Sequence, residues 1–123
     1  MGIWPGFVTP NVEQAKLFYQ QLFDAEIVYE AEDGWFVLLK IGGSELGFMQ
    51  PDLPFQAAAF RSAYGGQGSW ITIEVSDAKQ QLTRVEAQGI ELLAPLKDED
   101  WGDRHFVLCD PAGVAVDVVQ RLV

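Results

Sequence analysis

The sequence predicts an α+β fold built from two β-α-β-β-β repeats. Two segments carry the repeat, Trp4–Gln14 and Trp70–Gln80: each runs from a tryptophan through a short apolar stretch to a helix start, and the spacing is the same. Each half then ends on a strand that follows a glycine, at Gly43–Gln50 and at Gly113–Gln120. A duplicated unit accounts for both correspondences.

A helix is expected after each tryptophan segment. Asn11 and Asp77 are favourable N-cap residues, and each is followed three positions later by Gln, the spacing of a capping box. Residues 12–23 carry apolar side chains at spacings of three and four, which is typical of a helix with one buried stripe. The second helix is expected over Ala78–Gln88 and ends at Gly89.

Three strands complete the first repeat. Glu26–Ala31 and Trp35–Ile41 are rich in β-branched and aromatic residues, and Ser44–Gln50 is expected to follow the Gly42-Gly43 turn. Asp33-Gly34 between the first two runs is typical of a two-residue hairpin, because both residue types tolerate positive φ.

The second repeat is expected to continue with strands Ile90–Ala94 and Arg104–Cys109, a turn at Asp110–Gly113, and a last strand that reaches Gln120. Pro95–Asp103 is interpreted as an irregular loop with solvated acidic side chains.

The repeats therefore span residues 1–50 and 69–123 of a single predicted domain. They are joined by a linker at 51–68, in which Gln56–Ser62 is expected to form a short helical turn. A chain of 123 residues buries enough surface to fold without a disulfide or metal. The only cysteine, Cys109, is interpreted as a small buried hydrophobe.

Charge limits the classes of partner. The net charge of −10 argues against nucleic acid and anionic membranes, whose recognition depends on Lys and Arg, and favours a cationic partner. Met1–Pro5 contains neither a basic region nor a long apolar run, so neither a signal peptide nor a membrane span is expected. A cytoplasmic location is the resulting expectation.

The two repeats, together with Val8–Tyr19 and Trp101–Gly113, resemble the vicinal oxygen chelate superfamily, which includes glyoxalase I, extradiol dioxygenases, and fosfomycin- and bleomycin-resistance proteins. The resemblance spans essentially the whole chain. It implies a curved, largely antiparallel eight-stranded sheet around a concave cup. Since this superfamily supports unlike chemistries on one scaffold, the resemblance predicts fold better than function.

Metal-dependent members of that superfamily take ligands from the first and last strands of each half. The resemblance places those positions at Trp4, Gly47, Trp70 and Asp117. An indole has no lone pair for a cation and glycine has no side chain, so only Asp117 could ligate. We therefore expect no metal, no other cofactor and no catalytic residue.

A substitute metal site would need His105, Glu45, Glu74 and Asp117, and it would abandon the geometry of the family. We favour instead an ordinary role for His105, the only histidine, as a strand residue hydrogen-bonded to solvent or backbone.

Strand alternation predicts which residues face the cup. Ile71 and Ile73 should pack under the helices, so Trp70, Thr72 and Glu74 should face the opposite way. Indole faces stack on planar rings and attract cations, while carboxylates supply negative potential. The predicted ligand-binding residues are Trp4, Gly6, Glu45, Gly47, Trp70, Thr72, Glu74, Trp101 and Asp117. The alternative is that Trp4 and Trp70 simply fill the cup.

The favoured function is a metal-free protein that sequesters a cationic or planar aromatic compound, as in antibiotic resistance, without chemistry. The bleomycin-resistance branch that it resembles consists of acidic homodimers whose clefts use both chains, which implies a homodimer here. Whether the halves pair within one chain or across a swapped dimer is left open.

Two alternatives belong to other classes. A glyoxalase-type lyase, isomerase or dioxygenase would act on a small carbonyl or aromatic substrate, with Glu45, Glu74 or Asp117 as base. An interaction module would bury Trp35, Phe36 and Trp101 between subunits.

Overall fold

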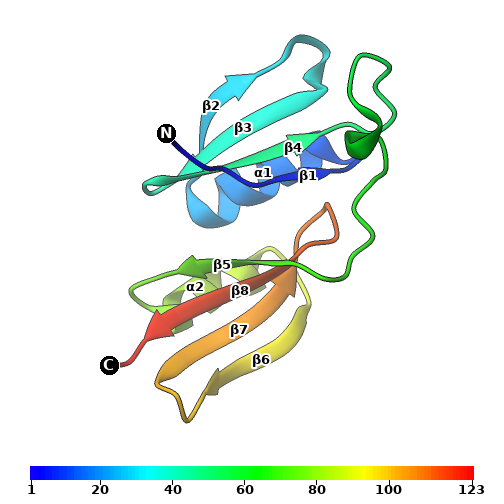
Figure 1. The fold of residues 1–123 in the computed structure, drawn as a ribbon. Helices are drawn as coiled ribbons and strands as arrows, with labels where there is room; N and C mark the ends of the chain where they lie inside the picture. Colours follow the sequence, from blue (N-terminus) through cyan, green and yellow to red (C-terminus); the bar gives the residue numbers. More distant parts are fainter. The chain divides into compact units, whose positions relative to one another are not determined.

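The computed structural model describes all 123 residues as two compact units, unit 1 (Met1–Gly65) and unit 2 (Gly66–Val123) (Figure 1). Both units have the element order β-α-β-β-β, and their strands form one four-stranded sheet each. The predicted α+β fold of two β-α-β-β-β repeats is therefore confirmed. No helix in the chain is long and apolar enough to cross a membrane.

Unit 1 consists of β1 (Gly6–Val8), α1 (Val12–Phe23), β2 (Glu26–Glu30), the 3-10 turn η1 (Glu32–Gly34), β3 (Phe36–Ile41), β4 (Ser44–Met49) and the 3-10 turn η2 (Ala58–Phe60). Its strand order is β1-β4-β3-β2. β1 and β4 run parallel, whereas the other neighbours are antiparallel.

Unit 2 consists of β5 (Trp70–Glu74), α2 (Ala78–Ala87), β6 (Leu92–Asp98), β7 (Asp103–Cys109) and β8 (Ala115–Arg121). Its strand order, β5-β8-β7-β6, repeats that of unit 1, again with one parallel pair, β5 and β8. The repeat also extends to register, because Gly6 pairs with Gly47 in unit 1 and Thr72 pairs with Asp117 in unit 2.

The helix of each unit covers one face of its own sheet (Figure 1). Successive side chains of a strand point to opposite faces of the sheet, so those that face the helix are buried. Those on the opposite face are available to form a site. The fully buried side chains of unit 1 include Ala15, Tyr19, Val37, Leu39 and Phe48. Those of unit 2 include Ala78, Val85, Phe106, Leu108, Val116 and Val118.

The two helices begin differently. Asp77 caps α2 as predicted, since its Oδ1 accepts the Gln80 backbone N–H at 3.1 Å. The predicted side-chain cap of Asn11 on α1 is wrong, because its φ of −103° and ψ of 44° depart from the extended conformation that Asp77 has. The buried Thr9 supplies the oxygen at this turn, and its Oγ1 accepts the Asn11 N–H at 3.0 Å.

The hairpin between β2 and β3 is longer than the predicted two-residue turn. Asp33 and Gly34 do have positive φ, 64° and 68°. However, they lie in η1, where the Gly34 N–H donates to the Ala31 carbonyl, and the first closing bond joins the Ala31 N–H to the Phe36 carbonyl. A 3-10 turn therefore replaces the tight turn.

The predicted loop at Pro95–Asp103 is wrong over its first part, because β6 continues to Asp98. Pro95 lies where the pairing with β7 shifts register, between Ala94 and Lys97. β6 is also an edge strand of its sheet. A residue without an N–H is tolerated at both kinds of position, so proline does not end the strand here.

The predicted burial of Cys109 is also wrong. This residue ends β7, and it is exposed. Its thiol donates to the Asp110 carbonyl at 3.4 Å. Partial burial of the sulfur, followed by the nearby Asp110 charge, raises the pKa of the thiol, which makes it a weak nucleophile near neutral pH.

Candidate functional site

Each unit has its own hollow on the sheet face that its helix leaves open. The hollow of unit 1, which we call the aromatic hollow, measures about 530 Å³ and is lined mainly by Trp4, Phe7, Tyr29, Trp35, Phe36 and Phe60. The hollow of unit 2, which we call the acidic hollow, measures about 580 Å³ and is lined by Trp70, Glu74, Trp101, Asp103, Asp117 and Arg121, among others. Both volumes lie within the range of small-molecule sites.

Trp4 forms part of the lining of the aromatic hollow because Gly47 has no side chain. A β-carbon at residue 47 would lie 2.9 Å from Trp4 Cζ3 and 3.3 Å from Phe36 Cε1. The Trp4 ring therefore occupies the space that any larger residue at 47 would need. Its ring centroid is 6.0 Å from that of Phe36, and its side chain remains 47% exposed.

Further aromatic rings surround this pair. The Phe36 ring centroid is 5.7 Å from that of Trp35 and 6.2 Å from that of Tyr29. No charged residue lines the hollow, and the lining residues whose side chains carry a polar group are Trp4, Tyr29, Trp35 and Gln56. The aromatic hollow thus presents aromatic ring faces and no charged group.

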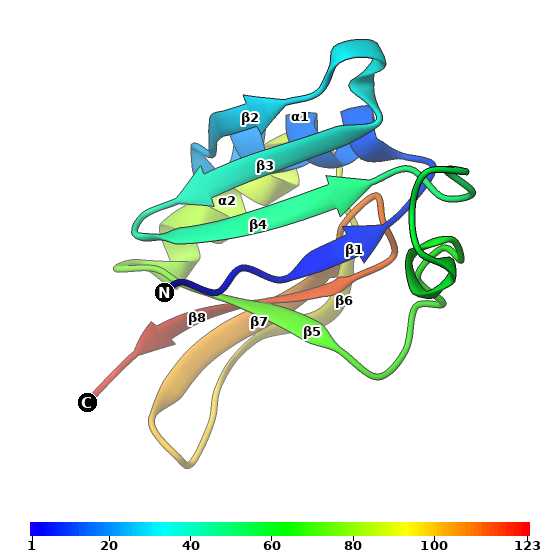
Figure 2. The ribbon, with the colours of Figure 1, turned by 45° about the horizontal axis from the view of Figure 1, so that its top comes forward.

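The segment between β4 and β5 supplies Gln56 and Phe60 to this hollow and folds back beside β1 (Figure 2). Its ends are held at the rim, because the Gln50 N–H donates to the Trp35 carbonyl and the Tyr64 N–H to the Val8 carbonyl, both at 2.8 Å. The expected helical turn is present as η2. Neither residue is among the predicted site residues, although aromatic residues in a segment interpreted as a linker were a signal.

The acidic hollow brings together five predicted site residues: Trp70, Thr72, Glu74, Trp101 and Asp117. Both indoles are 68% exposed. The Trp70 Nε1–H donates to Thr72 Oγ1 at 2.9 Å, and Glu74 is in an ion pair with Arg121, with 2.9 Å between Arg121 Nε and Glu74 Oε1. Part of the negative charge of the acidic hollow is thus compensated within unit 2.

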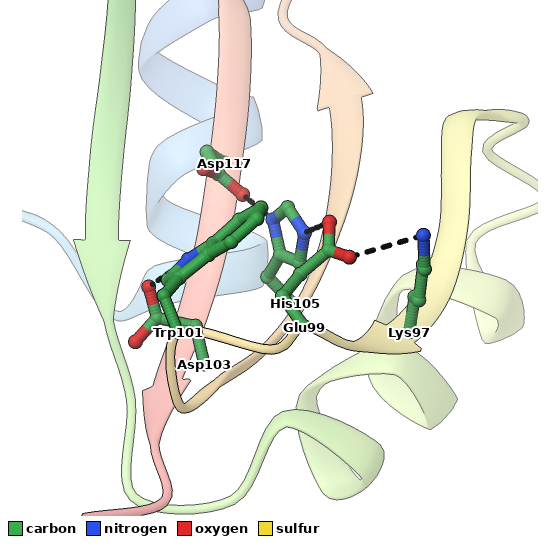
Figure 3. Close-up of polar contacts among 6 residues, drawn as sticks. All are labelled: Lys97, Glu99, Trp101, Asp103, His105 and Asp117. Carbon is green, nitrogen blue, oxygen red and sulfur yellow. Dashed lines mark hydrogen bonds and ion pairs between the residues drawn. The ribbon is translucent and has the colours of Figure 1, made fainter.

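His105 lies between two carboxylates, which corrects the prediction of an ordinary strand histidine (Figure 3). Its Nδ1 is 2.7 Å from Asp117 Oδ1, and its Nε2 is 3.0 Å from Glu99 Oε2. The hydrogen bond to Asp117 and then that to Glu99 raise the pKa of His105 above its ordinary value, against a smaller effect of burial. Both ring nitrogens are donors when the imidazole is protonated, so this geometry suits the cation.

The turn between β6 and β7 carries Trp101 onto this array. The Trp101 indole N–H donates to Asp103 Oδ2 at 3.0 Å, and its ring centroid is 6.3 Å from that of His105 (Figure 3). Glu99 also pairs with Lys97 at 3.0 Å, so His105 and then Lys97 lower the pKa of Glu99. Asp98 pairs with Arg104 at 2.7 Å. Asp98 and Glu99 are therefore held in ion pairs, and Asp98 remains exposed, as predicted for the acids of this stretch.

The predicted binding residues lie in two places. Trp4, Gly6 and Gly47 line the aromatic hollow, and the five residues named above line the acidic hollow. Glu45 lines neither; it is half-buried on β4 opposite Lys40.

The residues at the ligand positions of metal-dependent relatives do not fit a metal ion. In unit 1 the indole of Trp4 occupies the space above Gly47. In unit 2 Asp117 is hydrogen-bonded to His105, and Glu74 is paired with Arg121. No group of three or more His, Cys, Asp and Glu side chains is arranged to hold a metal, so the substitute site is not assembled either.

Comparison with known proteins agrees with this architecture. The profile of the Glyoxalase/Bleomycin resistance protein/Dioxygenase superfamily matches residues 4–118. The chain is 29% identical to the uncharacterized protein Mb0911c of Mycobacterium bovis, over 89% of this chain and 76% of that protein. TioX from Micromonospora sp. ML1 has a similar structure, with a TM-score of 0.80, 18% identity and 99% of each chain covered. Lactoylglutathione lyase from Agrobacterium tumefaciens gives a TM-score of 0.77 and 25% identity over 97% of this chain and 92% of that one.

Proposed function

Because the chain belongs to the glyoxalase/bleomycin resistance protein/dioxygenase superfamily, we propose that it is a metal-free binding protein that holds a planar aromatic compound in the aromatic hollow. The lining of the hollow carries this proposal: aromatic rings from the N-terminal segment, three strands and two connecting segments converge on about 530 Å³ without a charged side chain. Offset or edge-on ring contacts contribute about 0.5–1.5 kcal/mol each beyond burial, so a few of them suffice for specific binding.

The acidic part of the predicted cup supports binding less strongly. Its carboxylates lie in unit 2, where Glu74 faces Arg121 and Asp117 faces His105. A cationic ligand would have to displace these partners before it gained an ion pair. We therefore propose that ring faces, and not carboxylates, hold the ligand.

Isothermal titration calorimetry, which measures the affinity for planar aromatic compounds in the presence of a chelator, tests this function. The Trp4→Ala variant should weaken binding about tenfold, which corresponds to the loss of one stacking partner and its buried area. Leu93→Ala is the matched control, because Leu93 is also an exposed apolar residue, 63% accessible, but lines neither hollow. Loss of binding in Trp70→Ala, with Trp4→Ala unaffected, would move the site to the acidic hollow and contradict the proposal.

A glyoxalase-type lyase or isomerase, or a dioxygenase, is the alternative function. The similarity to lactoylglutathione lyase favours it. The candidate bases argue against it, since Glu74 and Asp117 already face cationic partners and Glu45 lines neither hollow. Turnover of lactoylglutathione that depends on Glu74 or Asp117, with or without added divalent metal, would establish the enzyme instead.

We propose further that the protein acts as a homodimer in the cytoplasm. β2 is one of the two edge strands of its sheet, and Ile27, Val28 and Tyr29 on it are 42%, 49% and 55% exposed. Apolar edge strands favour association between chains. Light scattering after gel filtration should give twice the mass of one chain for the wild-type protein. The Val28→Glu variant should have the mass of a single chain.

A further inference from the structure

The aromatic hollow has one carboxamide among its rings, and this narrows the class of ligand. Resting on the function proposed above, we infer that the ligand is an uncharged planar ring system bearing an amide-like group that hydrogen-bonds Gln56, and that Arg61 positions Gln56 without touching the ligand.

The absence of charge in the lining favours an uncharged ligand over a strongly charged one. No Asp, Glu, Lys, Arg or His side chain lines the aromatic hollow. A cation would lose hydration there and gain only contacts with ring faces, and an anion would gain no donor with a positive charge. An uncharged ring system loses little hydration and makes the same ring contacts. The hollow therefore discriminates by charge as well as by shape.

The Gln56 carboxamide can recognise a planar polar substituent, because its oxygen accepts and its amino group donates a hydrogen bond. The hydrogen bonds that Gln56 makes within the protein come from its backbone: its N–H donates to the Leu53 carbonyl at 3.1 Å, and its carbonyl accepts from Arg61 Nε at 3.0 Å. Gln56 is one of the residues that line the hollow, and it is half-buried. A carboxamide both donates and accepts, so its natural complement is a lactam, or a ring carbonyl adjacent to an N–H.

Arg61 holds the loop that presents this carboxamide. Its guanidinium bonds two loop carbonyls, those of Gln56 and, at 3.2 Å from Nη2, of Pro54. Its own carbonyl accepts the Asp52 N–H at 3.0 Å, which brings the two ends of the loop together. Arg61 is not part of the hollow lining. Arg61 therefore affects ligand binding only by fixing the position of Gln56. Compact loops whose ends meet are commonly held together by their own side chains in this way.

Three probes that share one tricyclic skeleton test the charge argument: acridone, which is neutral with a ring carbonyl and N–H, cationic 9-aminoacridine, and anionic acridine-9-carboxylate. Acridone should bind at least about tenfold more tightly than either ion, with little dependence on salt. If 9-aminoacridine binds as tightly as acridone, this inference is overturned while the proposed binding function stands. If none of the three binds in the titration, the proposed function itself fails.

Two pairs of variants test the roles of Gln56 and Arg61. Gln56→Leu keeps the approximate size of the side chain and should weaken acridone about three- to tenfold, the usual effect of one hydrogen bond, while Gln21→Leu on the exposed face of α1 should not. Arg61→Met should weaken acridone by a similar factor. Arg104→Met is its control, because that guanidinium also makes two hydrogen bonds but lies outside both hollows.

The double variant separates positioning from a general effect on the fold. If Arg61 acts through Gln56, Arg61→Met should have no further effect on acridone affinity in the Gln56→Leu background. Equal weakening in both backgrounds, or none in either, would overturn the positioning role. Arg61→Lys, which can still donate to one loop carbonyl, should recover part of the affinity, and it provides the test if Arg61→Met does not fold.

Discussion

The six-membered ring of Trp4 lies so close to the α-carbon of Gly47 that a β-carbon there would come within 2.9 Å of Trp4 Cζ3. In unit 2 the position matched by register is Asp117, whose Oδ1 is 2.7 Å from His105 Nδ1. The same place on the last strand of each repeat thus carries no side chain in one unit and a hydrogen-bonded carboxylate in the other. This difference is one reason why one hollow is aromatic and the other acidic.

Gly47→Ala should displace the Trp4 ring and weaken binding of a planar probe about tenfold, the effect of one lost ring contact. Because Trp4 is half-exposed, the ring can move, so the free energy of unfolding should fall by no more than about 1 kcal/mol. Acridone titration and thermal unfolding measure both quantities. Gly43→Ala adds a methyl group with no atom within 4 Å and serves as the control. Unchanged affinity in Gly47→Ala would show that Trp4 does not contact the ligand.

The second prediction concerns the pH dependence of His105. Because its pKa is raised in the folded protein, its contribution to stability is fully present below the ordinary histidine pKa of about 6.5 and is lost as pH rises through the folded value. His105 is the only histidine, so its ring proton resonances in an NMR titration need no assignment. The midpoint should lie above 6.5, and Glu99→Gln and Asp117→Asn should each lower it.

A matched control is available for Glu99→Gln. Asp98→Asn removes a carboxylate from the adjacent residue, but that carboxylate pairs with Arg104 and not with His105. Its effect on the midpoint should be clearly smaller. Equal shifts in the two variants would mean that only the general negative potential of the protein, and not the hydrogen bond to Glu99, sets the pKa of His105.

The third prediction covers the acid side of the same array. The pKa of Glu99 is lowered by His105 and Lys97, so its contribution to stability is present above the ordinary glutamate value and is lost as pH falls through the folded one. In wild type, the contacts between Glu99 and His105 should therefore persist from mildly acidic pH to above neutrality. Thermal unfolding of wild type and Glu99→Gln across pH should show the largest difference within this window. A difference in thermal stability between the two proteins that is the same at all pH values would contradict this prediction.

The repeat and its topology could be predicted because both units carry the same local signals. The tryptophan-to-cap spacing and the strands after Gly43 and Gly113 fix the order of elements independently of tertiary contacts. Local signals were less reliable where tertiary contacts determine the structure. Pro95 is predicted to begin a loop, but an edge strand with a register shift accommodates it.

The candidate site was predicted only in part, because alternation gives the face of a side chain but not its partner. His105 on β7 contacts Asp117 on the neighbouring strand β8, and it meets Glu99 only because β6 extends to Asp98 and brings the turn over β7. Similarly, Gln56 reaches the aromatic hollow through a loop closed by Arg61, and no periodic pattern in the sequence encodes such a closure.

The fourth prediction concerns the two helix starts, which use different oxygens. Asp77→Ala should lower the free energy of unfolding by about 1 kcal/mol, because it removes the acceptor of the Gln80 N–H. Thr9→Val should cost about 1–3 kcal/mol, since valine keeps the shape of a buried threonine but leaves the Asn11 N–H without the Oγ1 acceptor. Thr83→Val on the exposed side of α2 should change stability by less than about 0.5 kcal/mol. Urea denaturation measures all three, and an effect of Thr9→Val no larger than that of Thr83→Val would show that the Thr9 hydroxyl does not hold the start of α1.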